Sequence, residues 1–417
     1  MALNIRASTF MGLCLIAGWA TAVQALDYTR PKVRAVTAFV RLEPTTYTEQ
    51  ISEALGVLRS AKGELERQGY EVQTLRIVTQ PLGELVEGRA EAAALAFLTS
   101  LNELSAQQGF IPNVGPGMLR DADDPRTMRL LAHAMATLPN LMGSAIIAAD
   151  DGIHWRAIHE SAALVRYLAE HTAHGEGNFR FAASAMLRPY GPFYPGAWHT
   201  GPGRAFSIGL QGANLVEEVF ARTHGDFDGS VAELTRALTV HAQAVEKVGE
   251  QVAAARHWSF MGVDPTPAPA PLAGASIGAA IERYTGARFG SSGTLTAALI
   301  ITTAVKAVPV KQIGFSGLMV PVLEDRVLAR RWAEGAYNTD ALLAYSSVCA
   351  AGLDTVPYPG DISEEQLARI LGDVASLARK WHKPLAARLL PVPGKAAGEQ
   401  TDFNDPFLFN TTLHAVP

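Results

Sequence analysis

The 417-residue sequence predicts an α/β fold, in which helices cover a sheet that contains parallel strands. Short segments with strand-like alternation recur along the chain, and amphipathic helical segments separate them. The composition, 48% apolar and 18% charged, is typical of a globular protein that can form a sizeable core. From the residues alone, the sheet is either a closed barrel or a large open sheet covered by helices.

The first part of the chain predicts a strand–helix–strand unit. Residues 32–42 (KVRAVTAFVRL) alternate in the manner of a strand, and residues 45–68 follow with apolar side chains on one helical face. Gly69 is typical of a helix C-cap, and residues 71–78 form the second strand. The two strands are expected to be parallel because a helix connects them.

The rest of the chain continues the alternation. The middle part predicts a helix, an irregular loop, a strand, a helix, a short strand and a long interrupted helix, at residues 81–108, 110–126, 138–149, 154–171, 206–210 and 215–256. A proline-rich linker is expected at 262–276, and further helical and apolar segments alternate to residue 323. Ser363 begins a helix with two glutamates in its first turn, and residues 383–390 are the last predicted strand.

The segment 345–361 (YSSVCAAGLDTVPYPGD) is the predicted site region. Pro357 and Pro359 lack amide donors and Gly352 permits positive φ, so an irregular loop is expected there. Loops held between rigid elements often carry binding and catalytic residues.

The N-terminus resembles a secretory signal. Arg6 precedes a mainly apolar run at 10–23, and small residues flank Gln24 where a signal peptidase would cleave. We therefore expect a signal peptide at 1–25, one domain at 26–417, and a periplasmic or secreted protein without membrane attachment after cleavage. If the N-terminal extension is a wrongly assigned start, the protein is cytoplasmic. Cleavage would leave a single cysteine, which excludes an intramolecular disulfide.

The net charge of the chain and the spacing of its histidines limit the kinds of partner and metal that it is expected to bind. The net charge of −5 and the absence of a dense Lys/Arg cluster argue against nucleic acid as a main partner. His154 and His159 are five residues apart and do not fit the spacing of a helical zinc pair, so no metal site is predicted. A small-molecule ligand is the expected partner, and self-association into a homo-oligomer is left open.

Several long motifs resemble one family. They lie, in order, at 177–182 (GNFRFA), 276–282 (SIGAAIE), 314–325 (GFSGLMVPVLED), 345–361 and 383–403 (KPLAARLLPVPGKAAGEQTDF). The chain from about residue 32 onward is similar to the uncharacterised UPF0210 family, whose domain is called DUF711. The resemblance implies a large, single-domain α/β barrel like that of pyruvate formate-lyase, with helices packed outside it.

The resemblance also brings departures. Glycyl radical enzymes of that fold carry an adjacent cysteine pair and a C-terminal radical glycine segment, and neither pattern is found here. Ala350 stands where the family usually has glycine. The implied protein is non-radical, needs no identified cofactor, and has no reaction assigned by its fold.

Three residues are predicted to be catalytic. By analogy with the barrel enzymes Cys349 would lie at the centre, where an activated thiol could serve as nucleophile or proton donor. The alternative is an inert, buried cysteine. His199, in a backbone-rich turn, could be a general acid/base or a capping histidine, and Asp354 would orient the reacting groups.

Five residues are predicted to bind substrate. Arg180, which would point opposite to its two phenylalanine neighbours in a strand, could bind a carboxylate or phosphate, or could face solvent. The same two interpretations, a ligand-binding side chain or one that faces solvent, apply to Asn178 and Arg388. Ser316 lies in a possible anion-binding turn that could equally be a packing turn, and Lys395 could supply a loop cation.

These residues predict a non-radical enzyme that acts on a small polar molecule bearing a carboxylate. The alternatives are a periplasmic binding protein without catalysis and a metal-dependent hydrolase. The consecutive carboxylates Glu324 and Asp325 could contribute acid–base chemistry, although a helix N-terminus would use them equally well.

Overall fold

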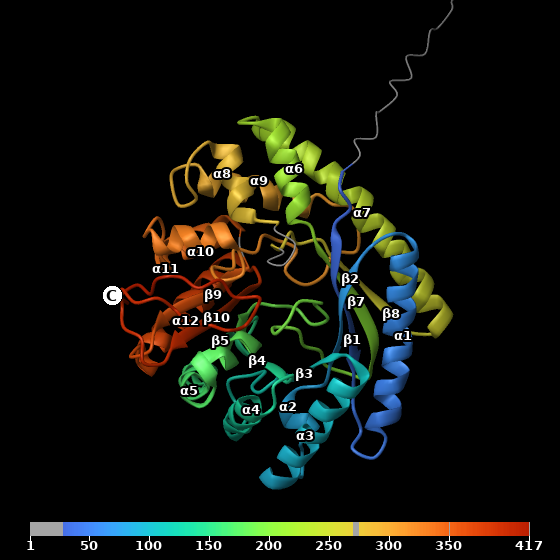
Figure 1. The fold of residues 1–417 in the computed structure, drawn as a ribbon. Helices are drawn as coiled ribbons and strands as arrows, with labels where there is room; N and C mark the ends of the chain where they lie inside the picture. The colour runs from blue at the N-terminus through green and yellow to red at the C-terminus, as the bar shows by residue number, and fades with distance from the viewer. Residues whose placement is uncertain (1–27, 270–274, 350, 417) are drawn as a thin grey trace, which may run out of the picture.

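The computed structural model describes residues 28–269, 275–349 and 351–416, with Cys349 described in its backbone only. One mixed ten-stranded sheet lies at the centre and helices surround it (Figure 1). The strands are β1 (Lys32–Val40), β2 (Val72–Val78), β3 (Ile111–Pro116), β4 (Met142–Ala149), β5 (Gly152–Ile153), β6 (Phe181–Ala185), β7 (Gly203–Gln211), β8 (Ser259–Asp264), β9 (Gly352–Pro359) and β10 (Leu385–Val392).

The strand order is β8-β7-β1-β2-β3-β4-β6-β10-β9, and the short β5 pairs with β4. Neighbours among β1, β2, β3, β4 and β6 are parallel, as the connecting helices require. The direction reverses at β1–β7 and at β6–β10. A central parallel block is therefore flanked by two reversed pairs, β7–β8 and β9–β10.

The helices lie outside the sheet (Figure 1). They are α1 (Tyr47–Arg67), α2 (Leu82–Leu85), α3 (Glu91–Gln108), α4 (Arg126–Thr137), α5 (Trp155–His171), α6 (Ala213–Thr223), α7 (Phe227–Arg256), α8 (Ile277–Thr285), α9 (Thr294–Lys306), α10 (Arg326–Ala333), α11 (Thr339–Cys349) and α12 (Glu364–Trp381), with a 3-10 helix η1 (Ala173–Arg180). No helix within the described ranges is both long enough and apolar enough to cross a membrane.

The α/β class and most predicted elements are confirmed. Helix α1 buries the predicted apolar face, with Ile51, Leu55 and Leu58 packed in the main core. Gly69, just beyond the end of α1, has a φ of 83°, which suits glycine. The predicted signal peptide lies outside the described residues and stays a prediction.

An irregular segment, 187–200, runs along the inner face of the sheet, where polar and apolar strand side chains both contact it. Thr37 Oγ1 of β1 donates a hydrogen bond to Pro192 O (2.9 Å), and Asn113 Nδ2 of β3 donates to Pro195 O (2.6 Å). The segment is visible as the green loop in the middle of Figure 1. The strands therefore hold the segment through its backbone carbonyls, and its Ala197 also packs with Phe39 of β1 and Val78 of β2 in a small apolar cluster.

The expected closed barrel is not found, because no ladder joins β8 to β9 in the described part of the chain. The segment 311–323 lies between these two edges and makes separate bonds to each. Ile313 N donates to Val263 O of β8 (3.1 Å), and Val322 N donates to Asp354 O of β9 (3.0 Å). Gly314, with φ of 74°, and Pro321, without an amide donor, prevent this segment from forming a regular strand.

Two segments predicted to be irregular contain strands. Residues 110–126 include β3, and residues 345–361 comprise the end of α11 and then β9, which pairs in parallel with β10. Pro357 and Pro359 are tolerated because β9 is an edge strand, where a missing donor can face away from the neighbouring strand. The prediction of a loop at 345–361 was wrong for this reason.

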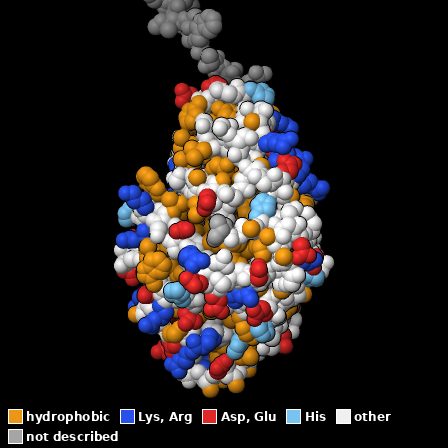
Figure 2. Space-filling view, turned by 90° about the vertical axis from the view of Figure 1, so that its left-hand side faces the viewer, with side chains coloured by type: hydrophobic (Ala, Val, Ile, Leu, Met, Phe, Trp, Pro, Cys, Tyr) orange, Lys and Arg blue, Asp and Glu red, His pale blue; other side chains and the backbone are white. Residues whose placement is uncertain are grey.

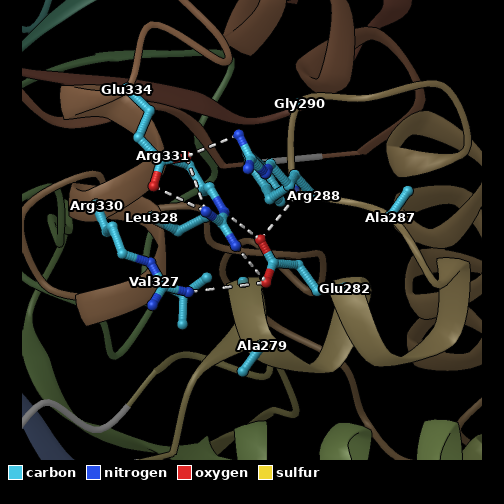
Figure 3. Close-up of polar contacts among 12 residues, drawn as sticks. Ala279, Glu282, Ala287, Arg288, Gly290, Val327, Leu328, Arg330, Arg331 and Glu334 are labelled. Atoms are coloured by element: carbon cyan, nitrogen blue, oxygen red, sulfur yellow. Dashed lines mark hydrogen bonds and ion pairs between the residues drawn. The ribbon is translucent and has the colours of Figure 1, made fainter.

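The glycine-rich turn 286–294 is a packing element. Glu282 at the end of α8 accepts a hydrogen bond from Phe289 N (2.9 Å) and from Arg331 Nε of α10 (2.5 Å), as Figure 3 illustrates for the ion pairs. Arg331 also pairs with Glu334 at 2.8 Å. On this side of the molecule acidic and basic side chains are interspersed (Figure 2). The network joins the turn to α10.

Candidate functional site

A cavity of about 60 Å³ lies between the inner face of the sheet and the two irregular segments. Strands β1, β2, β6 and β10 contribute Arg34, Arg76, Ala182 and Arg388, and β9 contributes Asp354. The rest of the lining comes from the segments 193–196 and 315–324 and from residues next to β8 and β9. The cavity is thus built from residues that are far apart in sequence.

Four charged side chains form one connected wall of the cavity. Arg388 donates through Nε to Asp354 Oδ1 (2.5 Å) and through Nη2 to Glu324 Oε1. Arg34 Nη2 lies 3.9 Å from the other oxygen of Glu324. Arg388 therefore holds both carboxylates, and Arg34 reaches only Glu324.

Burial and the neighbouring charges shift the pKa values of Glu324 and Arg388. It raises the pKa of Glu324, and the charge of Arg388 offsets part of that rise. For Arg388, burial alone would lower the pKa, but the charges of Asp354 and Glu324 outweigh burial and raise it. Arg388 therefore stays protonated, and Glu324 has an increased tendency to hold a proton.

Arg76 is the remaining cation of the cavity, and it is only 5% exposed. Its Nε donates to Thr74 Oγ1 (2.9 Å), its Nη1 lies 3.4 Å from Pro192 O, and its guanidinium lies over the ring of Tyr194 at 4.7 Å. No carboxylate of the described residues forms an ion pair with it. Burial, together with the nearby charge of Arg34, lowers its pKa to about 9, so the side chain is still cationic at neutral pH.

Part of the cavity lining is apolar. Phe193, Ala268, Phe315, Met319 and Ala351 line the cavity and belong to one small hydrophobic cluster, which is separate from the main core. Because these residues contact one another, the cavity has a continuous apolar surface in addition to its charged residues. Such a surface suits a ligand with one charged end and a short apolar body.

A β-bulge places Arg34 in this site. On β1, Val33 pairs with Leu210 and Ala35 pairs with Gly209, so Arg34 is an extra residue opposite β7. Strict alternation would put Arg34 and the inward-facing Thr37 on opposite faces of the sheet. A bulge re-aims a side chain, which explains how both reach the interior.

The model of the family described as "Uncharacterised ACR (DUF711)" matches residues 24–404. The chain belongs to the UPF0210 (DUF711) family. A UPF0210 protein of Pyrobaculum aerophilum is 33% identical over 395 residues, covering 89% of this chain and 87% of the relative. One of Desulforudis audaxviator is 29% identical over 371 residues, covering 85% and 82%.

Two of the predicted site residues of this UPF0210 protein meet in the cavity, namely Asp354 and Arg388. Ser316 lies beside the cavity-lining Phe315, but it is 3% exposed, and its Oγ donates to Ile313 O (3.0 Å). Cys349 ends α11, two residues before the cavity-lining Ala351. The side chain of Cys349 lies outside the described residues, so its catalytic role stays a prediction.

Arg180 and Asn178 lie elsewhere. Arg180 ends the 3-10 helix η1 and is not in a strand, so the predicted alternation with its phenylalanine neighbours does not apply. Its guanidinium donates to the carbonyls of Met135, Leu138 and Leu141 at 2.6–2.9 Å, at the C-terminal end of α4. Asn178 Nδ2 donates to Val165 O (3.0 Å) of α5. Both side chains satisfy backbone groups of neighbouring helices.

Lys395 and His199 are also not among the residues that line the cavity. Lys395 Nζ lies 3.6 Å from Asp402 near the C-terminus. His199 is fully buried against Phe39 and Tyr190, and its Nε2 lies 3.3 Å from Val40 O. Burial lowers the pKa of His199 to about 4, which keeps the ring neutral in the folded protein.

We expect the free energy of unfolding of His199→Phe to fall less than that of the parent as the pH is lowered. The unfolded-state pKa of histidine, about 6.5, exceeds the folded value, so folding loses stability as the pH falls from about 6.5 towards 4. Relative to the parent, the variant should gain roughly 2–3 kcal/mol between pH 7.5 and pH 4.5, measured by urea unfolding. His133→Phe, at a half-exposed site on α4, is the control. Equal pH profiles for parent and His199→Phe would contradict a neutral buried ring.

Sequence reading missed Arg34, Arg76 and the segment 193–196 as parts of one site. A signal existed at Arg76, because a charged residue between Leu75 and Ile77 is unusual in a buried parallel strand. No sequence signal marks Arg34, since its position depends on the bulge. The sequence presents Glu324 only as one of two consecutive carboxylates. The second, Asp325, accepts hydrogen bonds from Val327 N and Leu328 N and caps α10.

Among the described residues, no group of three or more His, Cys, Asp or Glu side chains is placed so that it could hold a metal ion.

Proposed function

We propose that this protein is a non-radical enzyme whose cavity binds a small carboxylate-bearing molecule. The observation that carries the proposal is Arg76, a buried guanidinium that lines the cavity without a carboxylate partner in the described chain. A buried unpaired charge is costly, and proteins normally pair it. A carboxylate bound to Arg76, with Arg34 close by, would supply the missing partner through charge-assisted hydrogen bonds.

Glu324 supports catalysis over binding alone. Its carboxyl group faces the same cavity, and burial raises its pKa, as is common for groups that exchange protons in enzymes. We therefore assign proton transfer with the bound molecule to Glu324, with Arg388 and Asp354 positioning it. A binding protein without catalysis would use the same cavity without this exchange.

We expect Arg76→Met to have two opposite effects. Removing an unpaired buried charge should raise the free energy of unfolding of the ligand-free protein by about 1–4 kcal/mol. The same variant should lose the stabilisation that carboxylates give the parent, which reaches about 2.7 kcal/mol at 100 times Kd. Thermal unfolding with sodium acetate, propionate, malonate and succinate, each against sodium chloride of equal ionic strength, measures both effects.

Arg369→Met on α12 is the matched control, because its side chain is 61% exposed and lies outside the cavity lining. It should leave carboxylate stabilisation unchanged. The proposed binding site is wrong if no carboxylate stabilises the parent, or if Arg76→Met responds as the parent does. With pyruvate in D₂O, an enzyme should accelerate exchange of the acidic C3 hydrogens and Glu324→Gln should not. Binding without exchange in the parent would instead favour the binding-protein alternative.

A further inference from the structure

The charges that line the cavity leave one positive charge unbalanced. Arg34, Arg76 and Arg388 contribute three positive charges, and Glu324 and Asp354 contribute two negative charges in the state in which both carboxyl groups are ionised. No lysine or histidine of the described chain lines the cavity. A bound monoanion would therefore make the site neutral.

A second anionic group on the ligand would exceed the single unbalanced positive charge of the lining. Five apolar residues, Phe193, Ala268, Phe315, Met319 and Ala351, also line the cavity and form one hydrophobic cluster. Tyr194 also lines the cavity, but its hydroxyl is directed to Ile111 O at 3.4 Å. A second carboxylate would be desolvated against apolar side chains or placed near Glu324, and either arrangement is unfavourable.

Size sets a further limit. A cavity of about 60 Å³ can hold a few waters, since each needs roughly 10–15 Å³ measured in the same way. That space corresponds to a ligand of about four to six non-hydrogen atoms. It suits a carboxylate with a tail of one to three carbon atoms.

We propose that the cavity selects a short monocarboxylate with an apolar tail and discriminates against dianions such as dicarboxylates and phosphate. This inference rests on the proposed function, because it assumes that a carboxylate binds at Arg76. It adds a substrate class: the guanidinium of Arg76 takes the single carboxylate and the wall formed by Phe193, Phe315 and Met319 takes the tail.

The test uses probes that differ by one carboxylate. Isothermal titration of the full-length protein compares propionate with malonate and butyrate with succinate, with inorganic phosphate as a third type of anion. We expect each monocarboxylate to bind about 100-fold more tightly than its dicarboxylate partner. Titration in two buffers with different ionisation enthalpies reports proton uptake, which should be close to zero for propionate.

Two variants change the charge of the wall. Glu324→Gln should raise the affinity for malonate relative to propionate by at least about tenfold, because the site then carries two unbalanced positive charges. Asp354→Asn should act in the same direction and serves if the first variant does not fold.

The outcomes separate the two proposals. If malonate or phosphate binds the parent as tightly as propionate, with or without proton uptake, and Arg76→Met abolishes this binding, the monoanion inference is overturned and the binding site stands. If neither variant changes the preference, the charge balance does not determine selectivity and the inference is equally overturned. If none of the anions binds, the proposed function itself fails.

Discussion

Replacing Arg388 with leucine is expected to lower the free energy of unfolding by about 3–5 kcal/mol. Arg388 is the shared partner of Glu324 and Asp354, so the variant leaves two carboxylates in the interior without their main cation. Removing one member of a buried ionic group costs more than the group contributes as a whole, because the remaining charges stay desolvated. Urea unfolding at pH 7.5 measures the change.

A combined variant distinguishes this explanation from a simple packing defect. Arg388→Leu together with Glu324→Leu and Asp354→Asn removes the uncompensated charges and should recover much of the lost stability. Arg369→Leu, which breaks an exposed ion pair with Glu365, should change the stability by less than about 1 kcal/mol. If Arg388→Leu lowers the free energy of unfolding by no more than Arg369→Leu does, Arg388 is not the main stabilising partner of Glu324 and Asp354.

The second large effect is expected at Asp264, the last residue of β8. Its carboxylate accepts hydrogen bonds from Phe315 N (2.8 Å), Ser316 N (3.1 Å), Thr266 N (3.1 Å) and Thr266 Oγ1 (2.5 Å). Asp264→Asn replaces an acceptor by a donor in a shell of donors. We expect a loss of about 2–4 kcal/mol, because each buried donor left unsatisfied costs about 1–3 kcal/mol.

This experiment is best done at pH 7.5, since burial raises the pKa of Asp264 to about 6 and the group is ionised above that value. Hydrogen exchange should show faster exchange at the amides of Phe315 and Ser316 in particular. Asp124→Asn, at an exposed position, is the control and should have little effect. Unchanged exchange at both amides would show that Asp264 does not hold the turn.

The sequence predicted the parts of the fold that depend on local pattern. The first strand–helix–strand unit, the helix at Ser363 and the last strand follow from periodicity, capping residues and glycine. Strand β9 could not be predicted from composition, because proline excludes central strands but not edge strands, and edge position is a property of the whole sheet. Whether the sheet closes into a barrel could not be predicted from composition either, because closure depends on how the segment 311–323 lies between β8 and β9.

The candidate site was predicted only in part for a related reason. Asp354 and Arg388 lie in motifs that the family resemblance singled out, so both were found. Arg180 looked equally suitable, yet it is bound to carbonyls of α4 because the chain forms a 3-10 helix at that position. Arg34 and Arg76 come from different strands and meet Glu324 only through the tertiary fold.

The way in which the segment 311–323 joins β8 to β9 determines what would follow if this segment were released from the sheet. Unpaired strand edges are templates on which other chains can add strands, and proteins commonly cover them. Here one irregular segment shields two such edges at once through a few separate hydrogen bonds, including the one from Ala351 N to Leu318 O (2.7 Å). Damage that releases it would expose both edges while the remaining ladder is intact, so the first consequence of such damage would be self-association of an otherwise folded protein and not loss of the sheet.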